Sequence, residues 1–131
     1  MSPLAQLAFV SLCGGIGCAL RVIARDALVR RGTHPWWSTC IVNLSGAMLM
    51  GLVAGSASGT SPALGPAVTT ALAGLLAGWT TYSAFSMDVV QLWLRGARGN
   101  ACVLWAATLL GAPAAALAGG AIARAAIGGA P

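Results

Sequence analysis

The feature that most constrains this chain is where its charged side chains do not occur. No Asp, Glu, Lys, Arg or His is found from Pro35 to Met87, and none is found from Gly99 to Ala123. A helix that crosses a bilayer needs about 20 consecutive, mostly apolar residues. The first interval is therefore long enough for two membrane spans and the second for one, while residues 4–20 supply another. We predict an all-α membrane protein with four transmembrane helices.

Composition excludes a water-soluble fold. Hydrophobic residues make up 58% of the chain and charged residues 7%, whereas about a quarter of the residues of an average soluble domain are charged. The net charge of +5 comes from seven Arg, no Lys and two Asp. The arginines flank the apolar segments, which is the usual topology signal of a membrane protein, and they do not form a basic face. We therefore expect a lipid bilayer around the chain and no nucleic-acid partner.

The segments between the apolar stretches contain residues that end helices. Residues 25–35 are polar and rich in Arg, residues 55–66 are rich in Ser, Gly and Pro, and residues 95–100 contain Arg, Gly and Asn. We predict one four-span domain, residues 1–131, with both termini on the same side. Its approximate spans are 4–24, 36–55, 67–92 and 101–123. Small residues four positions apart predict close helix packing, in the pairs Gly51 and Gly55, Gly74 and Gly78, and Ala115 and Gly119.

Asn43 is a polar residue inside the second apolar segment. A side-chain amide within a membrane helix is costly unless it finds partners, and polar residues at such depth often mark the path of an ion. Asn43 can form a hydrogen-bonding contact between helices, or its amino group can donate to an anion that passes through the protein. Residue types alone leave both interpretations open.

The run of residues 77–86 places Gly78 and the hydroxyl-bearing residues Thr80, Thr81 and Ser83 at the centre of the third segment. This run predicts that the third helix is broken near its centre. Non-helical backbone at membrane depth is tolerated only where protein or a wet cavity surrounds it, and the freed carbonyl groups can bind a cation. The alternative is a continuous helix that is bent by its Ser and Thr residues.

Tyr82 and Phe85 lie three positions apart, so their rings would share one face of the helix that continues after the break. The edges of aromatic rings carry partial positive charge, and ring edges beside hydroxyl groups suit a small, hard anion. Packing in the core is the other interpretation. Arg21, at the end of the first segment, either extends to the membrane surface or raises the anion concentration at the mouth of a pore.

Three motifs carry a resemblance to a known family. Residues 78–86, Gly-Trp-Thr-Thr-Tyr-Ser-Ala-Phe-Ser, resemble the Gly-Gly-Leu-Thr-Thr-Phe-Ser-Thr-Phe-Ser signature of the Fluc fluoride channels. Residues 14–21, Gly-Gly-Ile-Gly-Cys-Ala-Leu-Arg, are similar to its first-helix motif. Residues 37–46, Trp-Ser-Thr-Cys-Ile-Val-Asn-Leu-Ser-Gly, are similar to its second-helix motif. The motifs occur in the right order and spacing, so the resemblance covers essentially the whole sequence.

The resemblance implies a passive, fluoride-selective channel that exports fluoride from a bacterial cell through the inner membrane and so lowers its toxicity. It also implies an antiparallel dimer with two pores along the subunit interface and a structural sodium ion, not transported, at its centre. Arg21 would lie at the vestibule, and the main-chain carbonyls of Ala77 and Thr80 would bind sodium. The positions that correspond to the fluoride pore are Asn43, Thr81, Tyr82, Ser83, Phe85 and Thr108.

Three positions depart from the family pattern. Tyr82 replaces a phenylalanine, which keeps the ring and adds a hydroxyl that could hydrogen-bond fluoride or obstruct its path. Ala77 stands where the family usually has Gly, and Ala would be strained there if the backbone required a positive φ. Ala112 stands where a hydroxyl is expected, which leaves fewer polar groups along the fourth helix.

Other classes of function fit the sequence less well. A small four-helix exporter of cations or drugs needs a membrane-embedded carboxylate, but the first segment has no acid, and Asp26 and Asp88 lie near segment ends. A membrane assembly subunit without transport function would leave Asn43 and the hydroxyl-rich run unexplained. An enzyme is not expected, because the chain has one His, no paired carboxylates and no nucleophile within plausible reach of a base.

The arginines also predict an orientation. Arg21 aside, five arginines belong to the first and third loops and one, Arg124, to the side of the termini. Counting positive residues therefore places the first and third loops in the cytoplasm and both termini outside. An antiparallel homodimer needs the same chain inserted both ways, which this bias opposes. We expect either such a homodimer or a pair with a related chain of opposite orientation.

Overall fold

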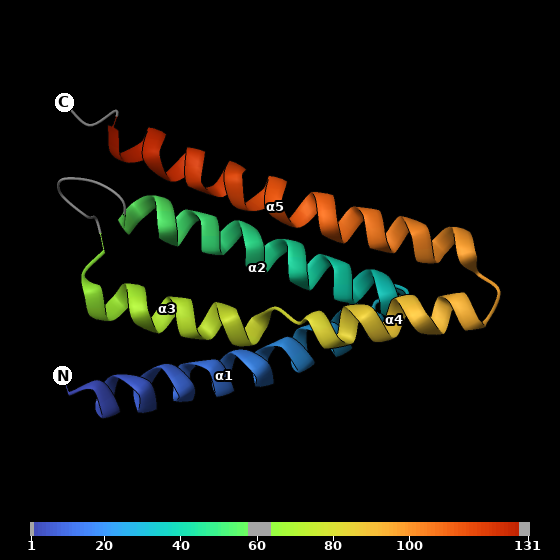
Figure 1. Cartoon of the computed structure of the whole chain (residues 1–131), viewed down its shortest axis with the longest axis horizontal. Coiled ribbons are helices and arrows are strands. Elements are labelled where there is room, and N and C mark those ends of the chain that lie inside the picture. The colour runs from blue at the N-terminus through green and yellow to red at the C-terminus, as the bar shows by residue number, and fades with distance from the viewer. Residues whose placement is uncertain (1, 58–63, 129–131) are drawn as a thin grey trace.

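The computed structural model describes residues 2–57 and 64–128, and within these residues the chain is helical and contains no strand. The elements are α1 (Pro3–Arg30), α2 (Pro35–Ala57), α3 (Pro66–Trp79), α4 (Tyr82–Leu94) and α5 (Arg98–Gly128). The helices lie side by side along one long axis, and α1 begins at the same end of the molecule at which α5 ends (Figure 1). The all-α architecture is as the sequence predicts.

Three helices of the described chain are long and apolar enough to cross a membrane, namely α1, α2 and residues 98–127 of α5. The third predicted segment corresponds to two shorter helices. Helix α3 ends at Trp79 and α4 begins at Tyr82, and Thr80 and Thr81 between them have extended backbone angles, with ψ of 156° and 119°. The two helices follow one another along the same side of α2 (Figure 1).

The predicted end of the first helix at residue 24 is wrong. Helix α1 continues to Arg30, so Arg25 and Asp26 are helical and do not belong to a loop. Two ion pairs stabilise these polar turns: Arg30 pairs with Asp26 one turn away on the same helix, and Arg25 pairs with Asp88 on α4. The pair of Asp26 and Arg30, at positions i and i+4, stabilises a helical turn that composition alone would place in a loop. The actual turn is short and contains Gly32, which has a φ of +90°.

Other helix boundaries also differ from those expected. Helix α5 begins at Arg98 and not at residue 101, because Gly96 with a φ of +78° completes the turn after α4 within three residues. Helix α5 also extends beyond residue 123, to Gly128, with Pro113 inside it. Helix α2 extends to Ala57, two residues into the predicted loop. Of that loop, residues 58–63 lie outside the described part of the chain.

Glycines allow two pairs of helices to pack backbone against backbone. A Cβ atom added at Gly17 of α1 would overlap the carbonyl oxygen of Leu75 on α3, and one added at Gly78 would overlap that of Gly14. Helices α2 and α5 are similarly close, because a Cβ atom at Gly51 would overlap the carbonyl oxygen of Ala116. Close approach through small residues is the means by which helices associate in lipid. The predicted pairs at 51/55 and 74/78 lie in these contacts.

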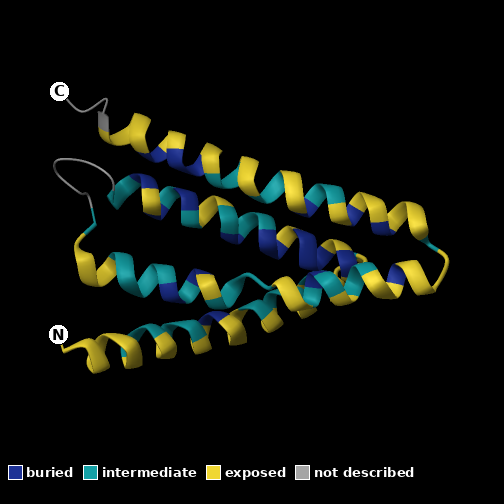
Figure 2. Cartoon of the chain, in the orientation of Figure 1, coloured by how far each residue is buried: buried dark blue, intermediate teal, exposed yellow. Residues whose placement is uncertain are grey.

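The best-buried side chains gather where α2, α4 and α5 meet, and Figure 2 shows the concentration of buried positions on α2. In contrast, α1 exposes large apolar side chains along most of its length, and Gly17 is its buried residue. Exposed apolar surface of this extent suits a helix in contact with lipid or with another membrane protein. The cluster of buried apolar side chains consists of Trp36, Cys40, Phe85, Leu92, Ala101 and Leu104.

Candidate functional site at the connection between α3 and α4

Asn43 on α2 binds the backbone of the connection between α3 and α4. Its Nδ2 donates to the carbonyl oxygen of Thr81 over 3.0 Å, and its Oδ1 accepts from the amide nitrogen of Thr81 over 2.8 Å. The side chain is buried. Because the extended backbone at Thr81 lacks helical partners, this amide supplies both the donor and the acceptor that the peptide group needs. This contact engages one of the two N–H groups of Nδ2.

Two further contacts hold the ends of the interrupted helices. The indole Nε1 of Trp79, the last residue of α3, donates to the carbonyl oxygen of Val42 over 2.9 Å and to Oγ of Ser45 over 3.1 Å. At the start of α4, Oγ1 of Thr81 accepts from the amide of Ala84 over 3.2 Å, as an N-cap residue does. The connection is thus held by α2 on one side and by its own cap on the other.

Opposite helix ends face each other across this connection. The C-terminus of α3 carries the partial negative charge of its last carbonyl groups, and the N-terminus of α4 carries partial positive charge. Arg21 on α1 lies at the negative end, where its Nη1 donates to the carbonyl oxygen of Thr80 over 3.4 Å. The guanidinium group therefore contacts the connection. The positive charge of Arg21 thus lies at the C-terminus of α3. The first N–H groups of α4 point back toward the connection from the opposite side.

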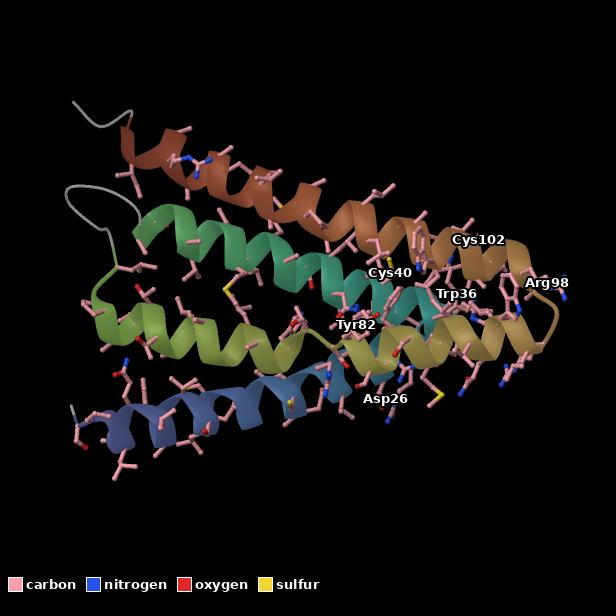
Figure 3. All side chains as sticks on the ribbon, in the orientation of Figure 1. Asp26, Trp36, Cys40, Tyr82, Arg98 and Cys102 are labelled. Carbon is pink, nitrogen blue, oxygen red and sulfur yellow. The ribbon has the colours of Figure 1, made fainter. Side chains whose placement is uncertain are left out.

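A pocket of about 350 Å³, which we call the central pocket, lies between α2, α4 and α5 beside the connection. The structure brings five of the six predicted pore residues together here. Figure 3 shows Tyr82 at the connection, with α2 and α5 beyond it. Ala112, the position at which a hydroxyl is expected, also contributes to the wall. The predicted residues that line the central pocket are Asn43, Thr81, Tyr82, Phe85 and Thr108, together with Thr80.

Ser83 lies elsewhere, in a second pocket of about 540 Å³ between α1, α2 and α4, which we call the outer pocket. Arg21 and Arg25 supply its positive charge, and Thr39 and Asp26 are among its other polar residues. Thr81 lines both pockets. The two spaces therefore adjoin at the connection between α3 and α4.

The two aromatic residues of the hydroxyl-rich run differ in environment. Their ring centroids are 5.7 Å apart and the planes are inclined by 53°, so the rings contact each other as expected for positions three apart. Phe85 is 3% exposed and belongs to the apolar cluster, whereas Tyr82 is 76% exposed. Phe85 therefore combines a packing role with a place in the wall of the central pocket. Tyr82 presents its ring at the open side of that pocket.

Thr108 on α5 is buried and directs its hydroxyl toward a thiol. Its Oγ1 donates to Sγ of Cys40 over 3.7 Å. Sulfur is a weak acceptor, and a hydroxyl group can rotate to a better partner. This contact therefore holds the hydroxyl group of Thr108 only loosely.

Asp88, to which the sequence interpretation gives no role at the site, binds two residues of the outer-pocket wall, Thr39 and Arg25. Asp88, whose side chain is 11% exposed, accepts from Oγ1 of Thr39 over 2.6 Å and from Nη2 of Arg25 over 3.4 Å. The signal in the sequence was the single acid that follows a long uncharged interval, together with the Thr one turn before Asn43. Because both oxygens of this carboxylate have partners, Asp88 is not a free carboxylate of the kind that a cation/proton exchanger requires.

The carbonyl oxygens predicted to bind sodium can be assessed from their surroundings. That of Ala77 accepts from Oγ1 of Thr80 over 3.4 Å, and that of Thr80 accepts from Arg21. A carbonyl oxygen has two lone pairs, so each retains one for a cation. Within the described chain no residue other than Gly has a positive φ, so Ala77 is unstrained in place of Gly. The residues present are thus compatible with a sodium ion. One of the two predicted ligands, the carbonyl oxygen of Thr80, also accepts a hydrogen bond from Arg21.

Comparison with known proteins agrees with the motifs. A family model described as CrcB-like protein, Camphor Resistance (CrcB), matches residues 8–122. The chain belongs to the CrcB-like family. Its relatives include a protein of Chelativorans sp. (strain BNC1), 36% identical over 107 residues, which are 81% of this chain and 86% of the relative. A protein of Rhodopseudomonas palustris (strain BisB5) is 36% identical over 84% of this chain and 86% of its own length. One of Agrobacterium fabrum (strain C58 / ATCC 33970) is 33% identical over 91% and 96%.

All three of these CrcB-like relatives bear the name fluoride-specific ion channel FluC. Those names describe ion channels and not enzymes, in agreement with the expectation from the residues. With three helices long and apolar enough to span a bilayer in its described part, the chain is a multi-pass membrane protein. The resemblance inferred from the three sequence motifs is confirmed at the level of the family.

Proposed function

We propose that this chain is the subunit of a fluoride channel that passively exports fluoride through the bacterial inner membrane and so lowers its toxicity. The observation that carries the proposal is the central pocket, which gathers Asn43, Thr81, Phe85 and Thr108 beside the N-terminus of α4. Donors of this kind suit an anion, and the relatives' names supply its identity as fluoride.

Several groups would stabilise fluoride without a full countercharge. Asn43 offers the N–H that Thr81 does not use, and the N-terminus of α4 adds partial positive charge. The hydroxyl groups of Thr81 and Thr108 can donate, and the ring edges of Phe85 and Tyr82 are electropositive. Such a distributed set binds an anion strongly enough to dehydrate it and weakly enough to release it, as conduction requires.

The two adjoining pockets support a route for the ion. Arg21 and Arg25 would concentrate fluoride in the outer pocket, where Ser83 offers a hydroxyl group. Thr81 lines both pockets, so fluoride would pass it to reach the central pocket. There Asn43 and then Thr108 would be its successive partners.

We also propose that α3 and α4 together form one interrupted membrane span, which makes four spans in all. Its two extended residues, Thr80 and Thr81, are bound by Asn43 and Arg21. Backbone that departs from a helix at this depth is acceptable where protein satisfies it. In this arrangement α4 contributes its N-terminus near the middle of the membrane.

An antiparallel dimer would cover the open side of the central pocket. Tyr82 is 76% exposed there, and a wall of polar groups facing lipid would be unfavourable. A second subunit would close the pocket and bring the carbonyl oxygens of Ala77 and Thr80 toward their counterparts. A structural sodium ion, which is not transported, would bind among those oxygens, since unwound backbone in transporters coordinates sodium in this way.

The partner of this subunit is either a second copy or a related chain inserted in the opposite orientation. The ends of α1 and α4 and the starts of α2 and α5 lie at one end of the molecule (Figure 1), which carries five of the arginines. Two of these are paired with Asp26 and Asp88, but acidic residues contribute little to orientation. A tag at the C-terminus, probed in intact cells, distinguishes the two. Similar inside and outside populations would favour the homodimer, and a single outside population would favour a related partner.

Fluoride efflux from liposomes that contain the purified chain alone tests the proposed function. We expect efflux of fluoride and not of chloride, with the Asn43→Asp protein inactive. Efflux of both halides alike would contradict fluoride selectivity. A correctly assembled protein that passes no fluoride, alone or with a related chain, would instead favour an assembly subunit without transport function.

A further inference from the structure

Arg21 lies within α1, on the part of the helix that glycines bring against α3. Gly17, one turn earlier on α1, lies so close to α3 that an added Cβ would overlap Leu75 and touch the amide of Trp79. This contact aligns Arg21 with the C-terminus of α3. The carbonyl groups at that end carry partial negative charge and attract a cation.

No carboxylate neutralises Arg21 in the described part of the chain. The chain has two acidic side chains, and each has another arginine as its partner: Asp26 pairs with Arg30, and Asp88 pairs with Arg25. The contact that is present is the one from Nη1 to the carbonyl oxygen of Thr80. The charge of Arg21 is therefore balanced by backbone dipoles at the connection between α3 and α4.

The same carbonyl oxygen is one of the proposed sodium ligands. A sodium ion on its second lone pair would lie within about 5 Å of the guanidinium group, where two positive charges repel appreciably in a partly buried site. We propose that Arg21 competes with sodium for the carbonyl oxygen of Thr80, so that an arginine outside the ligand set sets the sodium affinity. This inference rests on the sodium site of the proposed function.

The test measures thermal unfolding of the purified full-length protein as sodium is replaced by N-methyl-D-glucamine at constant ionic strength. A bound ion stabilises the folded protein according to its affinity, so each variant yields a half-saturating sodium concentration without any flux measurement. Arg21→Gln should lower that concentration by roughly tenfold or more, since charge repulsion at this range is worth at least that factor. Arg31→Gln removes the same charge from an exposed position outside both pockets and should behave as the unaltered protein.

A second variant covers the case in which Arg21→Gln does not fold. Arg21→Met keeps the length and the apolar stem of the side chain, and it should show the same tighter sodium binding. If the unaltered protein shows no response to sodium and either Arg21 variant does, the result supports competition, because Arg21 would then keep sodium from binding at the concentrations tested.

Two outcomes would overturn the inference. Equal or weaker sodium binding in the Arg21 variants would show that the guanidinium group does not compete and instead orients the carbonyl. No response to sodium in any variant would remove both the competition and the sodium site. The fluoride channel itself would still be judged by efflux from liposomes, so failure here and failure of the proposed function are distinguishable.

Discussion

Substitution of Asn43 separates its two roles, as a clamp on the connection between α3 and α4 and as a ligand for fluoride. Asn43→Ala removes both hydrogen bonds to Thr81. Asn43→Asp keeps an acceptor for the amide of Thr81 but places a second carboxylate oxygen opposite its carbonyl oxygen. The first change tests the clamp, and the second tests the response of the ion to a negative charge.

The expected magnitudes follow from burial and distance. A buried polar group that loses its partner costs about 1–3 kcal/mol, and Asn43→Ala leaves the N–H and the C=O of Thr81 unpaired. We therefore expect a loss of roughly 2–4 kcal/mol in the free energy of unfolding. In Asn43→Asp, a carboxylate about 4 Å from fluoride adds about 4 kcal/mol of repulsion at an intermediate dielectric. Flux should then fall on the order of a thousandfold.

The assay combines thermal unfolding in detergent with fluoride efflux from liposomes. Asn100→Asp is a matched control, because the same substitution falls in the first turn of α5 at an exposed position outside both pockets. It should leave the unfolding temperature and the flux unchanged. Gel filtration of each variant establishes that flux is compared between proteins in the same oligomeric state.

Two results would refute this reasoning. If Asn43→Ala unfolds at the same temperature as the unaltered protein, the hydrogen bonds to Thr81 do not hold the connection. If Asn43→Asp forms the native oligomer and conducts fluoride at the normal rate, Asn43 is a contact between helices and not a ligand.

Three further predictions concern the aromatic pair and the helix contacts. Phe85→Ile nearly conserves volume in the apolar cluster, so the loss of stability should stay below about 1.5 kcal/mol. Fluoride flux should fall sharply because the ring edge is gone. Equal flux of the two proteins in liposomes would show that the ring only packs. Tyr82→Phe changes an exposed side chain and should retain or raise flux at unchanged unfolding temperature, and complete loss would mean that this pore depends on the hydroxyl. Gly17→Ala should strongly lower the unfolding temperature because its Cβ would overlap the carbonyl oxygen of Leu75. Gly15→Ala should not, because a Cβ atom at Gly15 would meet open space. Similar unfolding temperatures for the two variants would contradict the packing of α1 on α3.

Much of the architecture follows from local properties of the sequence. The uncharged intervals predict apolar helices because a membrane span has a fixed minimum length. The run of Gly, Thr and Ser at residues 78–83 marks where the helical pattern changes, and in the structure α3 ends at Trp79 and α4 begins at Tyr82. The three motifs identify the family because each occupies consecutive residues.

Helix boundaries at the polar ends were less accessible from the sequence. The sequence predicts Arg25 in a loop because charged residues normally end an apolar span. In the structure it is part of α1 and pairs with Asp88, which lies 63 positions away on α4. A partner so distant in the chain has no signature in the local pattern that defines a helix.

The hydrogen-bond partners of individual polar groups depend on the tertiary structure. From the sequence, Asn43 could be a helix contact or an anion ligand, and Arg21 could extend to the surface or face a pore. In the fold, one N–H of Asn43 is taken by Thr81 and the guanidinium of Arg21 reaches Thr80. The physical reason is that a helix repeats over a few residues, whereas the choice of facing surfaces is made by close packing at glycines such as Gly17 and Gly51. That packing determines which polar groups, remote in sequence, come within hydrogen-bonding distance.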